Sequence, residues 1–187
     1  MSLKRNSLMQ LIISAVCLAL CMVLPFLTGQ IPQIGAMLCP MHLPILLAGF
    51  VCGGPVGAVV GFIAPLLRMV MFGMPPFYVA IAMAFELLTY GLVSGIMYRK
   101  VFKKQTVGTL YGSLLTAMVA GRIVWGIVKV ILSGIAADAG AFTFAAFISG
   151  ALLNAIPGIV VQLILVPAIV VALQKAKLIE ALSAEKA

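Results

Sequence analysis

Six long apolar segments, separated by short polar or glycine- and proline-rich connections, constrain the fold of this chain more than any other feature. Apolar residues make up 64% of the 187 residues and charged residues only 9%. A soluble domain is about half apolar and a quarter charged. An apolar helix of about 20 residues spans a bilayer. The sequence therefore predicts an all-α integral membrane protein, and it excludes a soluble domain and a disordered tail.

We expect one membrane domain, residues 1–187, with six transmembrane helices. Their approximate ranges are 9–28, 41–52, 56–72, 77–98, 107–133 and 144–173. Turns rich in glycine and proline separate several of them, for example at residues 53–55 and 73–76. The segment 29–40 is only half apolar and reads as a loop or lid. The first apolar segment is longer than the core of a secretory signal and lacks a cleavage site, so it is expected to remain as a helix.

Basic residues outside the six predicted spans all fall on one side of the membrane. They are Lys4, Arg5, Arg99, Lys100, Lys103, Lys104, Lys175, Lys177 and Lys186. An excess of Lys and Arg marks the cytoplasmic side of a membrane protein. We therefore expect a plasma-membrane protein with both termini in the cytoplasm. Because these charges flank apolar segments, they do not indicate a nucleic-acid-binding face.

Four charged residues lie inside the predicted spans: Arg68, Glu86, Arg122 and Lys129. A charge within the bilayer is costly, so it usually faces the protein interior and has a partner or a function. At 1.5 Å per residue, Glu86 and Arg122 lie roughly 15 Å from the outer ends of their helices, near the midplane. Arg68 and Lys129 lie nearer the outer face. This distribution predicts a pocket in the outer half that is closed towards the cytoplasm.

Arg122, Trp125 and Lys129 follow the helical spacing i, i+3 and i+7 and share one stripe of the fifth predicted helix. A cationic stripe with the only tryptophan of the chain suits an anionic or a planar, ring-containing ligand. The other interpretation is that Arg122 pairs with Glu86 as a structural contact, while Lys129 extends to the interface and Trp125 belongs to an aromatic belt. Both interpretations remain open.

Five further residues complete the candidate substrate-binding set, and Arg68, near the outer face, is one of them. Tyr90 shares a helix face with Glu86, and Glu86 can either neutralise Arg122 or accept hydrogen bonds from a ligand. Asn154 is expected at a similar depth in the sixth helix. His42 begins the second helix on the outer side, where it is a ligand contact, a proton relay or a packed side chain.

The sequence gives no sign of a metal site, a resident cofactor or an enzyme. The four cysteines, Cys17, Cys21, Cys39 and Cys52, form no CxxC pair. Only one acidic residue lies within the predicted spans, whereas an intramembrane enzyme needs a nucleophile with a base or paired metal ligands. No glycine precedes a lysine, so there is no Walker A loop, and the chain cannot drive ATP-dependent transport alone.

Several short motifs occur in an order that matches a known family. Ala15 and Ala19 form a small-xxx-small pair in the first predicted helix. They are followed by MHLPILLAGFVCGGPVGAVVGFIAPLL at residues 41–67, GMPP at 73–76, GRIVWG at 121–126 and NAIPG at 154–158. With six helices and a lid-like first loop, the chain resembles the S component of energy-coupling factor (ECF) vitamin transporters. It resembles most the branch that includes pantothenate, riboflavin and hydroxymethylpyrimidine transporters.

The resemblance implies a subunit that binds a vitamin or precursor with high affinity near the extracellular side. Its partners would be a membrane coupling subunit, the T component, and two cytoplasmic ATPases. Ala15 and Ala19 match the docking motif of the family. The fifth-helix stripe and Asn154 fall where ligand contacts occur, whereas Gln162 lies about 80° around the helix from Asn154 and ranks lower.

The sequence is compatible with more than one class of ligand. Three interior basic groups against one acid favour a carboxylate or phosphate, as in pantothenate, while Trp125 and Glu86 also suit a neutral flavin or pyrimidine. A different class of function is a stand-alone proton- or sodium-coupled carrier that uses Glu86 and His42. Such carriers usually contain an internal repeat, and the two halves of this chain show no convincing one.

Overall fold

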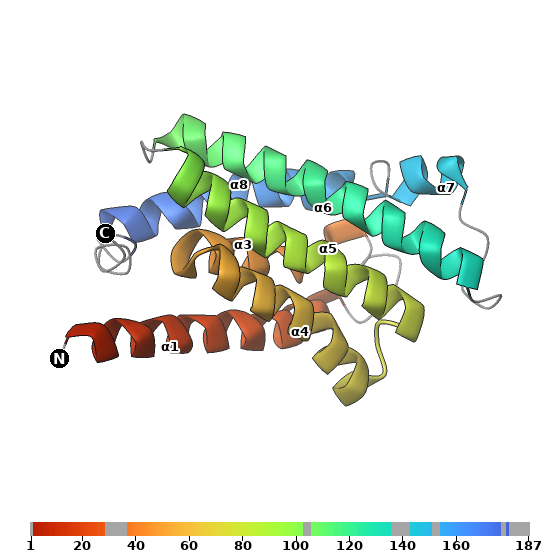
Figure 1. Cartoon of the computed structure of the whole chain (residues 1–187), viewed down its shortest axis with the longest axis horizontal. Coiled ribbons are helices and arrows are strands. Elements are labelled where there is room, and N and C mark those ends of the chain that lie inside the picture. The colour runs from red at the N-terminus through yellow and green to blue at the C-terminus, as the bar shows by residue number, and fades with distance from the viewer. Residues whose placement is uncertain are drawn as a thin grey trace.

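The structure is a computed structural model that describes residues 2–28, 37–102, 106–135, 143–150, 154–176 and 179. Within these ranges, every regular element is a helix (Figure 1). The elements are α1 (Ser2–Val23), η1 (Leu24–Thr28), α3 (His42–Cys52), α4 (Gly54–Phe72), α5 (Phe77–Ile96), η2 (Met97–Val101), α6 (Val107–Ile135), α7 (Phe144–Ile148) and α8 (Ile156–Lys175). This confirms the all-α class.

Five helical segments of the described chain are long and apolar enough to cross a membrane: 7–27, 54–72, 77–101, 107–135 and 156–175. The sixth apolar helix, α3, has 11 residues and is therefore only about 16 Å long. We call the two ends of the bundle the terminal end and the distal end. At the terminal end α1 begins and α8 ends, and at the distal end α4 meets α5 and α6 approaches α7 (Figure 1).

Helices α3, α4 and α5 form the centre of the bundle, and glycines bring their backbones into contact. A methyl group added at Gly91 of α5 would lie 2.3 Å from the backbone carbonyl of Gly57 in α4. One added at Gly61 would lie 2.3 Å from the carbonyl oxygen of Leu87. No side chain fits between these helices, so the small-residue spacing in the sequence produces close packing here.

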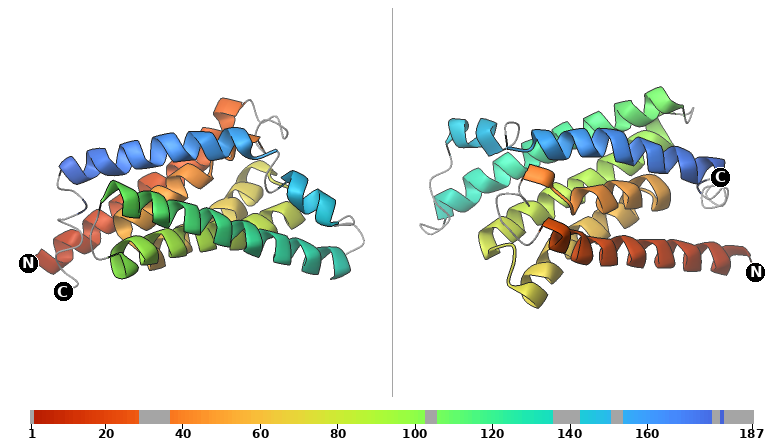
Figure 2. Two further views of the ribbon diagram at one scale, coloured as in Figure 1. Left: turned by 90° about the horizontal axis from the view of Figure 1, so that it is seen from above. Right: turned by 180° about the vertical axis from the view of Figure 1, so that it is seen from behind.

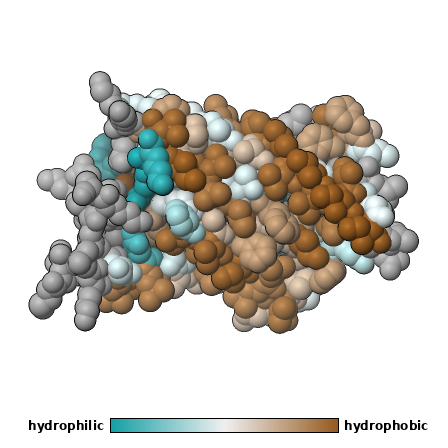
Figure 3. All heavy atoms as spheres, viewed as in Figure 1, coloured by the Kyte–Doolittle hydropathy of each residue, from teal (hydrophilic) through white to brown (hydrophobic). Residues whose placement is uncertain are grey.

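The outer helices expose apolar side chains away from this centre. Examples are Leu11 of α1, Ile123 of α6 and Ile164 of α8, each at least half exposed. α1 packs along one side of the bundle only, against α3 and α4 (Figure 2). On the face shown in Figure 3, hydrophilic side chains gather at the terminal end and apolar ones cover the rest. Such surfaces are stable in lipid rather than in water.

The prediction of one continuous sixth helix over 144–173 is wrong. α7 ends at Ile148, residues 154 and 155 form a turn, and α8 begins at Ile156. Pro157, in the first turn of α8, has no N–H and fits the start of a helix better than its interior. The first helix also differs: α1 begins at Ser2, and its last predicted turns form the 3₁₀ helix η1.

At the terminal end, the expected loop after α5 is partly helical and folds inward. Met97–Val101 form a π-helical turn that directs Tyr98 and Arg99 towards α3 and α8. Arg99 donates from Nε to the carbonyl oxygen of Phe50 at 3.3 Å and from Nη2 to that of Val51. Gln174 of α8 donates to the hydroxyl of Tyr98. Arg99 thus caps the last carbonyls of α3, in addition to any topological role.

Candidate functional site

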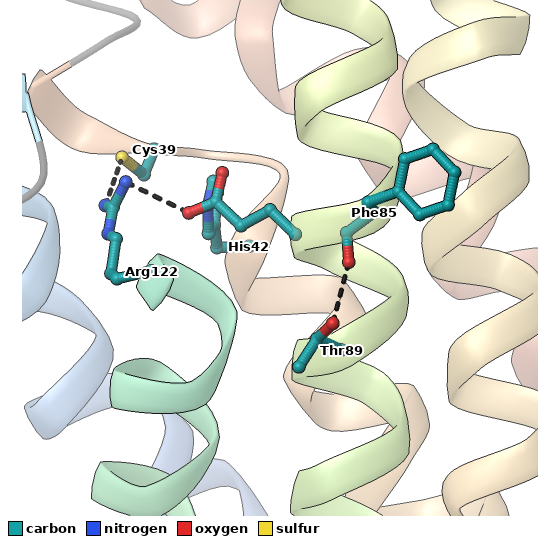
Figure 4. A network of polar contacts seen from close by, with 6 residues as sticks. Cys39, His42, Phe85, Thr89 and Arg122 are labelled. Atoms are coloured by element: carbon teal, nitrogen blue, oxygen red, sulfur yellow. Dashed lines mark hydrogen bonds and ion pairs between the residues drawn. The ribbon is translucent and has the colours of Figure 1, made fainter. Parts of the chain in front are cut away.

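Glu86 lies midway along α5 and is 1% exposed. Its Oε1 atom is 3.2 Å from Nε2 of His42 and 3.0 Å from Nη1 of Arg122. Figure 4 shows Cys39 in contact with Arg122 of α6, with His42 close to both. The structure therefore brings together three of the residues that the sequence singled out, from α3, α5 and α6.

A glycine explains why α6 comes close enough for this contact. A methyl group added at Gly121 would lie 2.3 Å from two ring carbons of Tyr90, one turn from Glu86 on α5. Because Gly121 has no side chain, α6 packs directly against the Tyr90 ring. The next residue, Arg122, then lies beside Glu86. The Tyr90 ring also packs edge-on against His42, with 5.0 Å between ring centroids.

The short helix α3 begins at His42, beside Glu86. A helix start carries a partial positive charge, which stabilises a nearby carboxylate. Pro44, in the first turn, lacks an N–H and is well suited to this position. Just before the helix, Cys39 has a φ of 47°, and its Sγ accepts a hydrogen bond from Nη2 of Arg122 at 3.6 Å.

Several buried polar atoms of this group have no hydrogen-bond partner among the described residues. They are Nδ1 and Nε2 of His42, Oε1 of Glu86, the hydroxyl oxygen of Tyr90 and Nε of Arg122. Oε1 of Gln162, on α8, is likewise without a hydrogen-bond partner. Buried polar atoms are nearly always paired with protein or water, because an unpaired one costs free energy. Unpaired atoms of this kind indicate a place where water or a ligand binds.

Gln162 of α8, which ranked lower as a possible ligand contact, is 2% exposed. It lies on the buried face of α8 with Gly158, one turn earlier. A methyl group added at Gly158 would lie 2.7 Å from the carbonyl oxygen of Met37, so this face packs on the segment before α3. The angle of Gln162 from Asn154 does not apply, because Asn154 lies outside the helix. Whether Gln162 contacts a ligand stays a prediction.

Two predicted site residues lie apart from this group. Asn154 is exposed in the turn before α8, and its Nδ2 donates to the hydroxyl of Ser149 at 3.3 Å. Its expected depth within a sixth helix was wrong because the helix is interrupted there. Arg68 is 4% exposed and donates to the carbonyl oxygen of Met22 at 2.6 Å. Its guanidinium also lies 5.0 and 5.2 Å from two phenylalanine rings, so it joins α4 to the end of α1.

Trp125 and Lys129 continue the Arg122 face of α6 towards the distal end, and both are half-buried. The ring of Trp125 packs on Phe147 of α7, with 6.2 Å between centroids. Between α6 and α7 runs a groove of about 550 Å³, lined by apolar side chains and Thr143. The role of the stripe in ligand binding stays a prediction.

The remaining predictions concern the small residues of α1, metal binding and the lid-like segment. Ala15 and Ala19 are exposed on α1. Among the described residues, no group of three or more His, Cys, Asp or Glu could hold a metal ion. The lid-like segment falls largely on residues 29–36, which lie outside the described residues, as do Lys103, Lys104, Lys177 and Lys186.

The fold and site define a multi-pass helical membrane protein with a buried, incompletely paired polar group in the middle of its bundle. Residues 9–170 match the family model of the substrate-specific component of ECF transporters, and the chain belongs to this family. It is thus a transport protein of a family of substrate-binding subunits rather than of enzymes. No curated protein and no solved structure gave a significant match.

Proposed function

We propose that this chain is the high-affinity binding subunit for uptake of a vitamin or vitamin precursor. It would work with a T component and two cytoplasmic ATPases, which supply the energy. The family match over most of the chain carries this proposal. The unpaired polar atoms around Glu86 support it, because a capture subunit needs a buried site that its ligand completes.

We place the terminal end of the bundle in the cytoplasm and the protein in the plasma membrane. Arg99, Lys100 and Lys175 lie at this end, together with the start of α1. Because basic residues favour the cytoplasmic side, the distal end faces outward. A ligand would then enter from the distal end, pass the level of Lys129 and Trp125, and stop at Glu86 and Arg122.

The function is tested by uptake of radiolabelled vitamins in cells that express the chain with or without the coupling subunit and ATPases. We expect uptake only with the complete set. Mass spectrometry of the molecule released from the purified protein identifies the ligand. Uptake that survives deletion of the ATPases would instead support the stand-alone carrier, in which the contact between His42 and Glu86 serves ion coupling.

Ala15 and Ala19 form the proposed docking face for the T component, because both are exposed and small. Replacing either with leucine should abolish uptake and leave ligand affinity within about twofold, since neither residue contacts the Glu86 group. Ala168→Leu is the matched control: it changes an exposed alanine on α8 instead and should leave uptake unchanged. Equal loss of binding and uptake in the α1 variants would contradict the docking role.

A further inference from the structure

The opposite charges of Arg122 and Glu86 pair with each other in this buried polar group, although the chain as a whole has a charge of +8. Nη1 of the Arg122 guanidinium lies 3.0 Å from Oε1 of Glu86. Arg68, which also contributes to the positive charge of the spans, is engaged with Met22 and two aromatic rings. Neither Arg122 nor Arg68 therefore gives this group an unpaired positive charge.

The unpaired atoms of the group include both donors and acceptors. Nε of Arg122 is a donor only. The hydroxyl of Tyr90 can do either. Nδ1 of His42 is an acceptor when Nε2 carries the proton and faces Glu86, as the 3.2 Å contact favours. A molecule that completes this group must therefore donate as well as accept hydrogen bonds.

A carboxylate or phosphate would satisfy these atoms poorly. An ionised acid only accepts hydrogen bonds, so it could not pair with Nδ1 of His42 when that atom is an acceptor. It would also approach the carboxylate of Glu86, and two like charges in a buried site repel strongly. Arg122 is already neutralised and cannot compensate for this repulsion without giving up its contact with Glu86.

We infer that the site around Glu86 binds an uncharged group that presents hydrogen-bond donors and acceptors side by side, such as a carboxamide, a ureide or a pyrimidine edge. This rests on the proposed function and specifies its substrate class. An acidic group elsewhere on the same ligand would lie towards Lys129, about 10 Å further along α6.

Matched pairs of neutral and anionic probes test the inference on the purified full-length protein. Pantothenol and pantothenate form one pair, and riboflavin and its 5′-phosphate form another. Calorimetry gives the ratio of neutral to anionic affinity in the native chain and in Glu86→Gln, Arg122→Gln and Lys129→Gln. Fluorescence of the single tryptophan, Trp125, and thermal melting show whether each variant is folded.

We expect Glu86→Gln to shift the ratio towards the anionic probe by at least about tenfold, because it leaves the Arg122 charge unpaired. Any binding of an anionic probe to the native chain should weaken in Lys129→Gln and persist in Arg122→Gln. The inference is overturned if Glu86→Gln leaves the ratio unchanged. It is also overturned if the native chain binds the anionic probe and, of the three variants, only Arg122→Gln abolishes that binding.

Failure of the proposed function has a different signature. In that case neither member of any pair binds, and the purified protein releases no small molecule. Binding of an anionic probe through Arg122 would contradict only the substrate class and would leave the capture function intact.

Discussion

Two groups of buried polar residues lie in this bundle, and they differ in how completely their atoms are paired. At the terminal end, Arg99 and Gln174 donate hydrogen bonds to backbone carbonyls of α3 and to Tyr98. Around Glu86, by contrast, atoms of Arg122 and Tyr90 are buried without a hydrogen bond among the described residues. The first group holds helices together, whereas the second keeps polar atoms that no described residue pairs. Pairing, more than residue type, distinguishes the structural group from the candidate site.

The two glutamines of α8 show the same difference in hydrogen-bond pairing within one helix. Gln174 reaches the hydroxyl of Tyr98 at the terminal end, whereas the side-chain oxygen of Gln162 has no partner in the described chain. Both side chains extend from the same helix, and only their surroundings differ. Variants at the two groups should therefore separate effects on stability from effects on ligand binding.

Gly91→Leu should disrupt the close packing of α4 and α5, on which the positions of both polar groups depend. A methyl group at this position already lies 2.3 Å from the backbone of Gly57, which cannot move aside. We expect a loss of about 3 kcal/mol or more in the free energy of unfolding, together with loss of ligand binding. Thermal melting in detergent measures the first effect. Gly134→Ala is the control, since nothing lies within 4 Å of its added carbon, and it should melt like the native chain.

Arg99→Ala should affect stability without affecting the site. It removes the hydrogen bonds to Phe50 and Val51 and leaves the last carbonyls of α3 unpaired. We expect a loss of about 2 kcal/mol in stability and no more than a twofold change in ligand affinity. Lys100→Ala, an exposed neighbour, should change neither quantity. A large loss of affinity in Arg99→Ala would show that the two groups are coupled.

Substituting each glutamine of α8 with leucine should produce opposite results. Gln174→Leu removes a paired group and should lower stability by about 1 kcal/mol, with binding unchanged. Gln162→Leu removes an unpaired buried oxygen, so stability should stay the same or rise, while ligand affinity should fall at least about fivefold. Calorimetry and melting curves of both variants check this. Similar losses of stability in both variants would contradict the difference in pairing between Gln174 and Gln162.

Much of the fold follows from sequence pattern, because each apolar segment must be a helix in a bilayer. The second predicted helix, 41–52, and the third, 56–72, agree with α3 and α4 within about two residues. The sixth differs because hydropathy alone does not show an interruption: residues 144–173 are apolar on both sides of the turn at Asn154 and Ala155. A proline in an apolar segment is compatible with a kink or with a new helix start, and tertiary contacts select between them.

The site was predictable in part for a similar reason. The cost of burying Glu86 and Arg122 in a membrane indicates that these residues face the interior, and their depths follow from helix geometry. The partner of each charge does not follow. Arg68 has the same side chain as Arg122 but finds a carbonyl oxygen and aromatic rings instead of a carboxylate. Depth along one helix says little about which face of another helix lies opposite.

The sequence alone determined that this chain is a helical membrane protein, because its apolar length and sparse charges leave no other stable state. It also determined which residues are too costly to face lipid. Only the tertiary structure decided that Gly121 brings Arg122 to Glu86 and that Arg99 donates hydrogen bonds to carbonyls of α3 at the other end. Pairing of polar atoms depends on distances between separate helices, and these distances arise from packing rather than from the order of residues within any one helix.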